Sequence, residues 1–150
     1  MRKLGFMVPV VAAVVVLAMG PAPGAPSGLT REELGRGTAA ADYQVGGGAG
    51  TEVVVMRVTI EPGGASGWHT HPGPETAIVK AGTLTFFDSQ DPECAAQTFS
   101  AGQAVVGTGQ AHMARNLGDV PVELLVSYYD VAAGGATAAP AEEPAHCAGR

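Results

Sequence analysis

The chain has 150 residues and a formal net charge of -6, with 46% hydrophobic residues, 5% aromatic residues, 22 glycines and 11 prolines. A single domain of this length can bury a hydrophobic core, and so many turn-forming residues favour short strands over long helices. Because Arg2-Lys3 is the one pair of adjacent basic residues, the composition argues against nucleic acid and anionic membrane surfaces as partners.

A basic start and an apolar run from Val8 to Met19 open the chain. The run is too short for a comfortable membrane span, and Pro- and Gly-rich sequence follows it, which is typical of a secretory signal peptide. We assign residues 1–24 to this signal, with cleavage near Gly20 or near Gly24, and predict a secreted or extracytoplasmic protein. An uncleaved N-terminal anchor is the alternative.

Residues 25–50 are expected to form a linker and an N-terminal arm. Thr30 and Glu33 match a capping box, which predicts one or two helical turns ending near Gly35 or Gly37. The main domain is expected to span residues 51–131, followed by an Ala/Pro/Gly-rich tail over 132–150.

Short strands dominate the main domain. β-branched residues and strict alternation predict the first strand over 52–60, where Met56 and Val58 share a face with Val54 and Ile60. An extended segment through His69 and His71 follows. The remaining predicted strands cover residues 75–80, 83–87, 97–100, 103–106, 112–116 and 122–130. Turn signals at intervals of roughly 8–12 residues indicate an all-β sandwich or barrel.

The stretch from Gly63 to Gly82 carries the densest chemistry in the chain. His69 and His71 are two residues apart, so in an extended strand their side chains point to the same face. A Pro-Gly-Pro turn then reverses the chain, and Glu75 at the start of the next strand can meet the two imidazoles. Two imidazoles and a carboxylate suit zinc, manganese, iron, nickel or copper. Two surface histidines beside a turn glutamate are the alternative.

The chain contains two cysteines, Cys94 and Cys147. In an exported protein an even number of cysteines suggests a disulfide, and closing the loop between these two would stabilise the fold by about 4 kcal/mol. The bond would hold the tail against the loop that contains Cys94. Two free thiols are the alternative.

Two motifs resemble those of the cupin superfamily. The first is Gly63-x5-His69-x-His71-x3-Glu75-x6-Gly82, which agrees at every position. The second is Gly109-x2-His112-x3-Asn116, with Gly102 near the place of its leading glycine and Gly107 where the family usually has proline. The resemblance covers roughly residues 50–130. It implies a double-stranded β-helix, or jelly-roll barrel, that holds one divalent transition metal through His69, His71, Glu75 and His112.

Strand parity then predicts which residues surround such a site. The inward positions are largely apolar, and we expect a ligand pocket formed by Met56, Val58, Val79, Phe86 and Tyr128. Parity admits only one of Tyr128 and Tyr129 as an inward phenol. Arg57, Lys80 and Arg115 fall on the outward face.

Cupin folds host many activities, so the fold does not determine the function. We expect an exported, metal-binding protein with a pocket for a small organic ligand, because acid and base groups beyond the metal ligands are scarce. A metal-dependent, dioxygenase-type oxidoreductase is the alternative, because four ligands leave coordination positions open. A zinc hydrolase or a sugar isomerase fits less well for want of a free base. By analogy with small cupins, residues 42–45 could be exchanged in a homodimer.

Overall fold

The computed structural model describes residues 32–150. The predicted signal peptide, 1–24, and Thr30 of the predicted capping box lie outside these residues. All strands belong to one unit, Glu33–Arg150, and in the described part of the chain no helix is long and apolar enough to cross a membrane.

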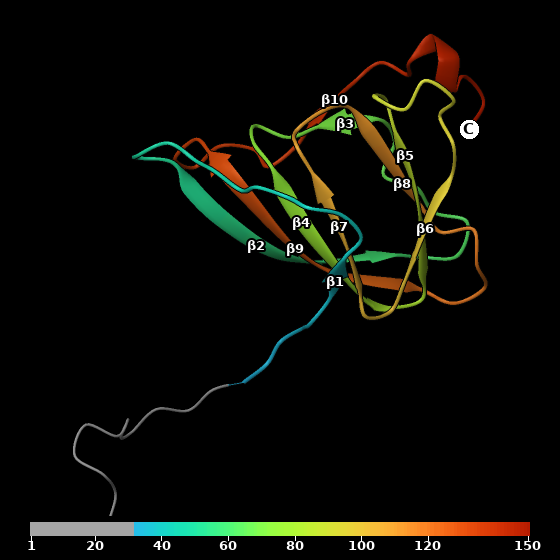
Figure 1. Cartoon of the computed structure of the whole chain (residues 1–150), viewed down its shortest axis with the longest axis horizontal. Helices are drawn as coiled ribbons and strands as arrows, with labels where there is room; N and C mark the ends of the chain where they lie inside the picture. The colour runs from blue at the N-terminus through green and yellow to red at the C-terminus, as the bar shows by residue number, and fades with distance from the viewer. Residues whose placement is uncertain (1–31) are drawn as a thin grey trace, which may run out of the picture. The chain divides into compact units, whose positions relative to one another are not determined.

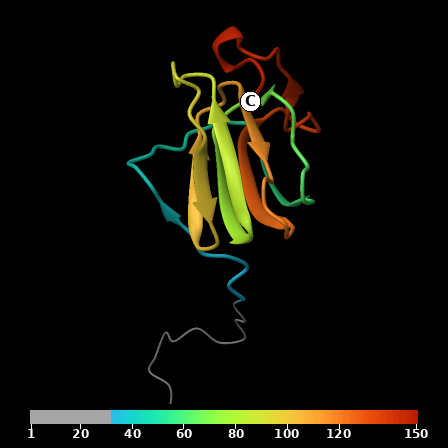
Figure 2. The same cartoon turned by 90° about the vertical axis from the view of Figure 1, so that its right-hand side faces the viewer.

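Two five-stranded sheets make up this unit (Figure 1). In order across the first sheet the strands are β1 (Thr38–Ala39), β7 (Gln103–Gly107), β4 (Glu75–Ala81), β9 (Val122–Val131) and β2 (Glu52–Ile60). The second sheet contains β10 (Ala139–Pro140), β3 (His69–Thr70), β8 (His112–Arg115), β5 (Thr83–Asp88) and β6 (Gln97–Ser100), and Figure 2 looks towards it. Only the β1–β7 pair is parallel. The predicted double-stranded β-helix is therefore confirmed.

The strands form where alternation and turn chemistry predict them. On β9, for example, every second residue from Val122 to Tyr128 is buried, while Glu123 is exposed. Such alternation gives one face to the core and leaves the other outside. The buried inner faces form one hydrophobic core between the sheets, consisting of Ile60, Ala77, Val79, Leu84, Phe86, Phe99, Val105, Val122, Leu124, Val126, Tyr128 and Val131.

A second, smaller cluster lies on the other face of the second sheet. Phe87 and Met113, neighbours of the inward residues Phe86 and His112, pack there with Trp68 and the two cysteines. Cys94 and Cys147 form the predicted disulfide. Trp68, which precedes His69, thus faces away from the core between the sheets and packs against the C-terminal tail.

The N-terminal arm differs from its prediction. Residues 32–37 form no helix, and Glu33 and Arg36 form an exposed ion pair instead. One isolated turn containing Gly35 cannot offset the cost of helix nucleation. Residues 42–45 are exposed and belong to no strand, while the short strand β1 lies just before them.

Motif glycines occupy the tight turns between strands. Gly63, Gly82, Gly102 and Gly109 all have positive φ, a conformation that costs other L-residues about 1–2 kcal/mol. Asn116, the last residue of the second motif, fixes another turn. It is buried, its Nδ2 donates to the carbonyls of Ile60 and Val120, and its Oδ1 accepts from the amide of Gly118.

Gly82→Ala is expected to destabilise the fold by at least about 2 kcal/mol. Gly82 has φ +74°, and an added Cβ would lie 2.7 Å from the Pro121 carbonyl oxygen and 3.0 Å from the Val122 Cα. Gly63→Ala is the matched control, because Gly63 has φ +78° and no atom within 4 Å of the added Cβ. Urea unfolding should show the larger loss at Gly82, and equal losses would contradict the steric argument.

Candidate metal centre

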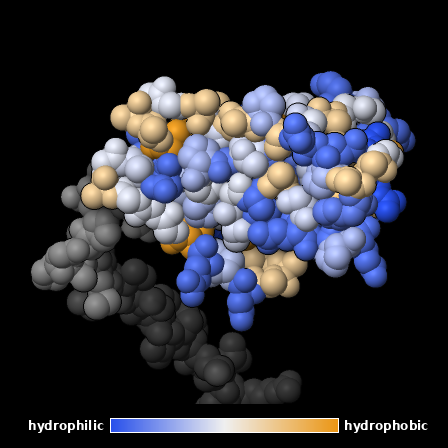
Figure 3. All heavy atoms as spheres, turned by 90° about the horizontal axis from the view of Figure 1, so that it is seen from above, coloured by the Kyte–Doolittle hydropathy of each residue, from blue (hydrophilic) through white to orange (hydrophobic). Residues whose placement is uncertain are grey.

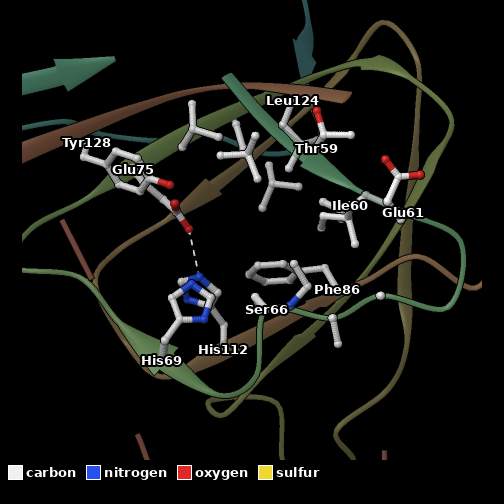
Figure 4. A pocket seen from close by; sticks show the side chains of 18 residues that line it. Thr59, Ile60, Glu61, Ser66, His69, Glu75, Phe86, His112, Leu124 and Tyr128 are labelled. Atoms are coloured by element: carbon white, nitrogen blue, oxygen red, sulfur yellow. Dashed lines mark hydrogen bonds and ion pairs between the residues drawn. The ribbon is translucent and has the colours of Figure 1, made fainter. Parts of the chain in front are cut away.

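Three strands from two sheets bring the predicted ligands together. His69 on β3 lies directly opposite His112 on β8 in the second sheet, and His71 follows the end of β3. The turn over residues 72–74 then carries the chain across to the first sheet, where Glu75 opens β4. The carboxylate therefore approaches the three imidazoles from the opposite sheet, as Figure 4 shows for His69, His112 and Glu75.

His71, Glu75 and His112 contact one another, and the ring of His69 lies against the rings of His71 and His112. One ring nitrogen from each of the three histidines falls within a group whose members are all within 4.8 Å of one another, so this cluster could hold a metal ion. Glu75 Oε2 is 3.2 Å from His71 Nε2, and Glu75 Oε1 is 3.0 Å from His112 Nε2. The Nε2 atoms of His71 and His112 are 3.3 Å apart. His71, Glu75 and His112 are all buried.

A hydrogen bond at Nδ1 fixes the orientation of each imidazole ring. The Nδ1 atoms of His69, His71 and His112 lie 2.9, 2.6 and 2.9 Å from backbone carbonyl oxygens. A carbonyl only accepts, so each Nδ1 carries the hydrogen and donates it. In the neutral rings Nε2 is then left with a lone pair, and each Nε2 acts as an acceptor.

The donor set therefore fits a metal ion. Lone pairs on Nε2 and the oxygens of Glu75 are all acceptors, and with neutral rings no donor lies among them. A buried carboxylate against such lone pairs is unfavourable unless a proton or a cation is shared between them. Three imidazole nitrogens and one carboxylate are typical ligands of a divalent transition metal, and imidazoles held by carbonyls are typical of metal sites.

In the metal-free protein the same contacts shift the titration of the site. Burial acts to raise the pKa of Glu75, but the hydrogen bonds that His112 and His71 donate when Nε2 carries a proton, together with their charge, outweigh burial and lower the pKa to about 2. Burial acts to lower the pKa of His71, but the contact with Glu75 outweighs it and the pKa is raised. Burial lowers the pKa of His69. Glu75 therefore stays ionised, and available as a ligand, throughout the neutral range.

Gly107 makes room for the glutamate ligand. It lies directly opposite Glu75 in the β4–β7 pair, and an added Cβ would sit 3.0 Å from Glu75 Oε1 and 3.1 Å from its Cγ. These distances are tighter than ordinary van der Waals contact, so the carboxylate would have to move by a few tenths of an ångström. Gly107, which stands where the family that the motifs resemble usually has proline, thus lies against a predicted metal ligand.

Gly107→Ala is expected to weaken metal binding by roughly tenfold, the lower end of what a change beside a metal ligand costs, and to leave the fold intact. Gly46→Ala is the matched control, since an added Cβ there meets nothing within 4 Å. Competition titration with a metal-binding dye measures both affinities. Equal affinities in the two variants would show that Glu75 tolerates the added methyl group.

A cavity of about 320 Å³ extends between the sheets from His69, Glu75 and His112, whereas His71 does not line it. Figure 4 shows His69, His112 and Glu75 at one end and Glu61 at the other, with Phe86 on the wall between them. Glu61, Thr59 and Ser66 are exposed at the rim, whereas Glu75 and His112 are buried. Most of the remaining wall is apolar, and none of the described residues that line it is Arg or Lys.

The structure places three of the five predicted pocket residues on this wall. Val58, Phe86 and Tyr128 line the cavity. Val79 is fully buried in the core but does not line it, and Met56 is 43% exposed. Parity assigns Met56 to the inward face, but β2 is the edge of its sheet, where Val54 and Val58 are only partly buried and Ile60 alone is buried.

Sequence reasoning missed the polar rim. Ser66 and Glu61 lie in the segment between β2 and β3. This segment consists largely of turn-forming residues, and such a composition does not indicate which side chains reach the cavity. The Ser66 hydroxyl accepts from the amide of Ala114 on β8 and so fixes this segment across the cavity entrance. No pattern of spacing marks such a contact, because it depends on how the loop folds back.

Tyr128 supplies the phenol of the cavity wall. Burial, and to a smaller extent the charge of Glu75, raise the pKa of Tyr128 to about 12. The hydroxyl therefore keeps its proton at neutral pH and can donate a hydrogen bond, but it cannot serve as a base there. Its ring lies 4.9 Å from that of His71.

Comparison with known proteins agrees with this architecture. The Cupin domain family matches residues 56–128. A cupin-like protein from Thermotoga maritima superposes with a TM-score of 0.51 and 23% identity, over 61% of this chain and 65% of that one. A Klebsiella pneumoniae protein with a double-stranded β-helix domain gives a TM-score of 0.50 and 26% identity, over 75% and 90% of the two chains.

A structure of DMSP lyases gives a TM-score of 0.51 with 21% identity, over 60% of this chain and 44% of that one. The chain thus spans slightly less than two thirds of the Thermotoga protein and under half of the lyase, and these likenesses show the fold alone. No curated protein sequence matches the chain. The family match, the fold of the relatives and the two-sheet barrel lead to one conclusion: the chain belongs to the cupin superfamily.

Proposed function

We propose that this cupin binds one divalent transition metal through His69, His71, Glu75 and His112, and takes a small organic ligand into the adjoining cavity. The buried cluster of acceptors at the closed end of the cavity carries the proposal, because only a shared cation or protons make it stable. A bound metal of this kind supplies Lewis acidity and coordination positions open to a ligand.

The chain's own residues suggest the class of ligand. The cavity volume lies at the lower end of the range for small-molecule sites, about 300–1,000 Å³. Its wall offers apolar contacts, the Tyr128 hydroxyl as donor, and Glu61 at the rim, but no positive side chain among the described residues. We therefore expect a neutral, mainly apolar ligand with one polar group directed towards the histidines. A carboxylate on any other part of the ligand would face the apolar wall without a partner.

The disulfide supports a location outside the cytoplasm. The disulfide between Cys94 and Cys147 is fully buried, and such bonds persist in oxidising compartments. Together with the signal-like N-terminus, this supports a secreted or extracytoplasmic protein.

A dioxygenase-type oxidoreductase remains the second candidate, and the composition of the cavity wall favours it over a hydrolase. Glu75 is committed to the ligand cluster, Tyr128 keeps its proton, and Glu61 sits at the exposed rim. The described residues therefore place no further base near the histidine cluster, so any catalysis would have to depend on the metal itself.

Elemental mass spectrometry on protein recovered from the exported fraction, with its disulfide intact, tests the proposal. We expect about one metal ion per chain. In a separate thermal-shift measurement, alcohols should raise the unfolding temperature more than dicarboxylates of matched size. Iron, manganese, copper or nickel would justify measuring oxygen consumption, whereas zinc would favour a binding role. Absence of stoichiometric metal after reconstitution with each of these ions would overturn the proposed function.

A further inference from the structure

The C-terminal tail, residues 132–150, runs back along the strand that carries a metal ligand. Its short strand β10 pairs with β3, with Ala139 opposite Thr70 and Pro140 opposite His69. The Ala141 amide then donates to the Trp68 carbonyl over 3.0 Å. Figures 1 and 2 both show this segment, in red, beside the end of the second sheet. The tail is therefore the outer neighbour of β3.

The tail also provides the carbonyl that orients His71. For His69 and His112 the accepting carbonyl lies two residues earlier in the chain, at Gly67 and Gln110. His71 Nδ1 instead lies 2.6 Å from the Thr137 carbonyl oxygen, 66 residues away in sequence. His71 follows the end of β3, so the hydrogen bonds that pair β3 with its neighbouring strands do not fix its position. Its ring orientation thus depends on where the tail lies.

Besides the disulfide, the tail is held mainly by hydrogen bonds: the β10–β3 pairing, the Ala141–Trp68 bond, and bonds from Gly134 to Glu52 and from Arg150 to Glu93. Within residues 132–150 the single buried side chain is Cys147, in the 3-10 turn Ala145–Cys147. The molecular surface seen from above in Figure 3 is a mixture of hydrophilic and weakly hydrophobic residues. Cys94 sits in a well-defined loop, where the Asp91 carboxylate accepts from the amides of Glu93 and Ala95. The bond therefore ties a weakly packed segment to a fixed point on the second sheet.

We propose that the tail is a positioning element of the metal centre: the Thr137 carbonyl fixes the ring of His71, and the Cys94–Cys147 disulfide keeps that carbonyl in place. The proposal rests on the proposed metal binding, and it makes full metal affinity dependent on the disulfide. Loss of an outer partner of a metal-ligating histidine typically weakens binding by about 10–100-fold.

The double variant C94A/C147A tests this inference, with Glu143→Gln as a tail control that keeps the disulfide. We expect the double variant to bind zinc about 10–100-fold more weakly, and hydrogen exchange at the Ala141 amide to quicken while the β4–β9 amides stay protected. In the metal-free protein, long-range proton–nitrogen spectra of the imidazoles should show a changed protonation pattern for His71 and an unchanged one for His112. The control should match the wild type in all three measurements.

A folded double variant with zinc affinity within about twofold of wild type and unchanged His71 signals would overturn the inference. So would equal changes in all three histidine rings, which would indicate general loosening instead. If the double variant fails to fold, Ala141→Pro decides, since it removes the amide bonded to Trp68 and leaves the disulfide intact. The ring spectra need no metal, so a wild type that binds none would refute the proposed function while the test of the tail still stands.

Discussion

His112→Ala is expected to weaken metal binding by roughly 100- to 1,000-fold. Apparent binding energies of four-ligand zinc sites are about 10–16 kcal/mol, so one ligand of four accounts for roughly 3–4 kcal/mol, and each 1.4 kcal/mol is tenfold in affinity. His112 is 2% exposed and contacts both Glu75 and His71. Its removal therefore takes a ligand away and also frees one oxygen of Glu75.

His146→Ala is the matched control for this variant. His146 is the one histidine of the chain outside the cluster, and it is exposed in the tail beside Cys147. Competition titration gives the affinities, and circular dichroism checks that the barrel remains folded. If His112→Ala kept wild-type affinity, or if His146→Ala lost it, the ligand assignment would be wrong.

The grouping of His69, His71 and Glu75 could be predicted from the sequence because their positions follow from strand periodicity. His69 and His71 share a face by spacing alone, and Glu75 meets them because a turn of fixed length reverses the chain. The structure brings these residues close together, and with them His112, which the second cupin-like motif had assigned to the same site. Strand positions were equally predictable: β2 and β6 coincide with the predicted ranges 52–60 and 97–100.

The sequence contains no comparable periodic pattern for the outer parts of the site. Thr137 contacts His71 through a backbone carbonyl, which any residue type provides, so nothing in the sequence marks it. The two-residue strands β1 and β10 are too short for alternation to appear. Met56 shows a different limit, because parity gives the face of a residue but not whether the opposite sheet reaches far enough to cover it.

Glu75→Gln is expected to have opposite effects on function and on stability. Metal binding should fall by at least about 100-fold, since an amide is a much weaker ligand than a carboxylate at a site built for a divalent cation. In the metal-free protein at a pH above the raised pKa of His71, however, the variant should be more stable than wild type. There the buried carboxylate faces lone pairs of neutral imidazoles, whereas the glutamine amide can donate to one of them.

Acid should reverse the sign of that stability difference. The pKa of His71 is raised above 6.5, so its pairing with Glu75 is complete below about pH 6.5 and is lost as the pH rises through the raised value. The pKa of Glu75 is lowered from 4.5 to about 2, so its contribution is present above pH 4.5 and is lost as the pH falls towards 2. Wild type therefore gains most from the carboxylate between about pH 4.5 and 6.5.

Thermal unfolding of chelator-treated proteins at about pH 5.5, and at a pH above the raised pKa of His71, tests this reversal. Glu75→Gln should unfold at a lower temperature than wild type at the first pH and at a higher temperature at the second. Glu61→Gln, which removes a carboxylate at the exposed rim of the same cavity, should show no such crossing. A difference of the same sign at both values would mean that the cluster is not strained without a cation, and the main physical reason for placing a metal there would be lost.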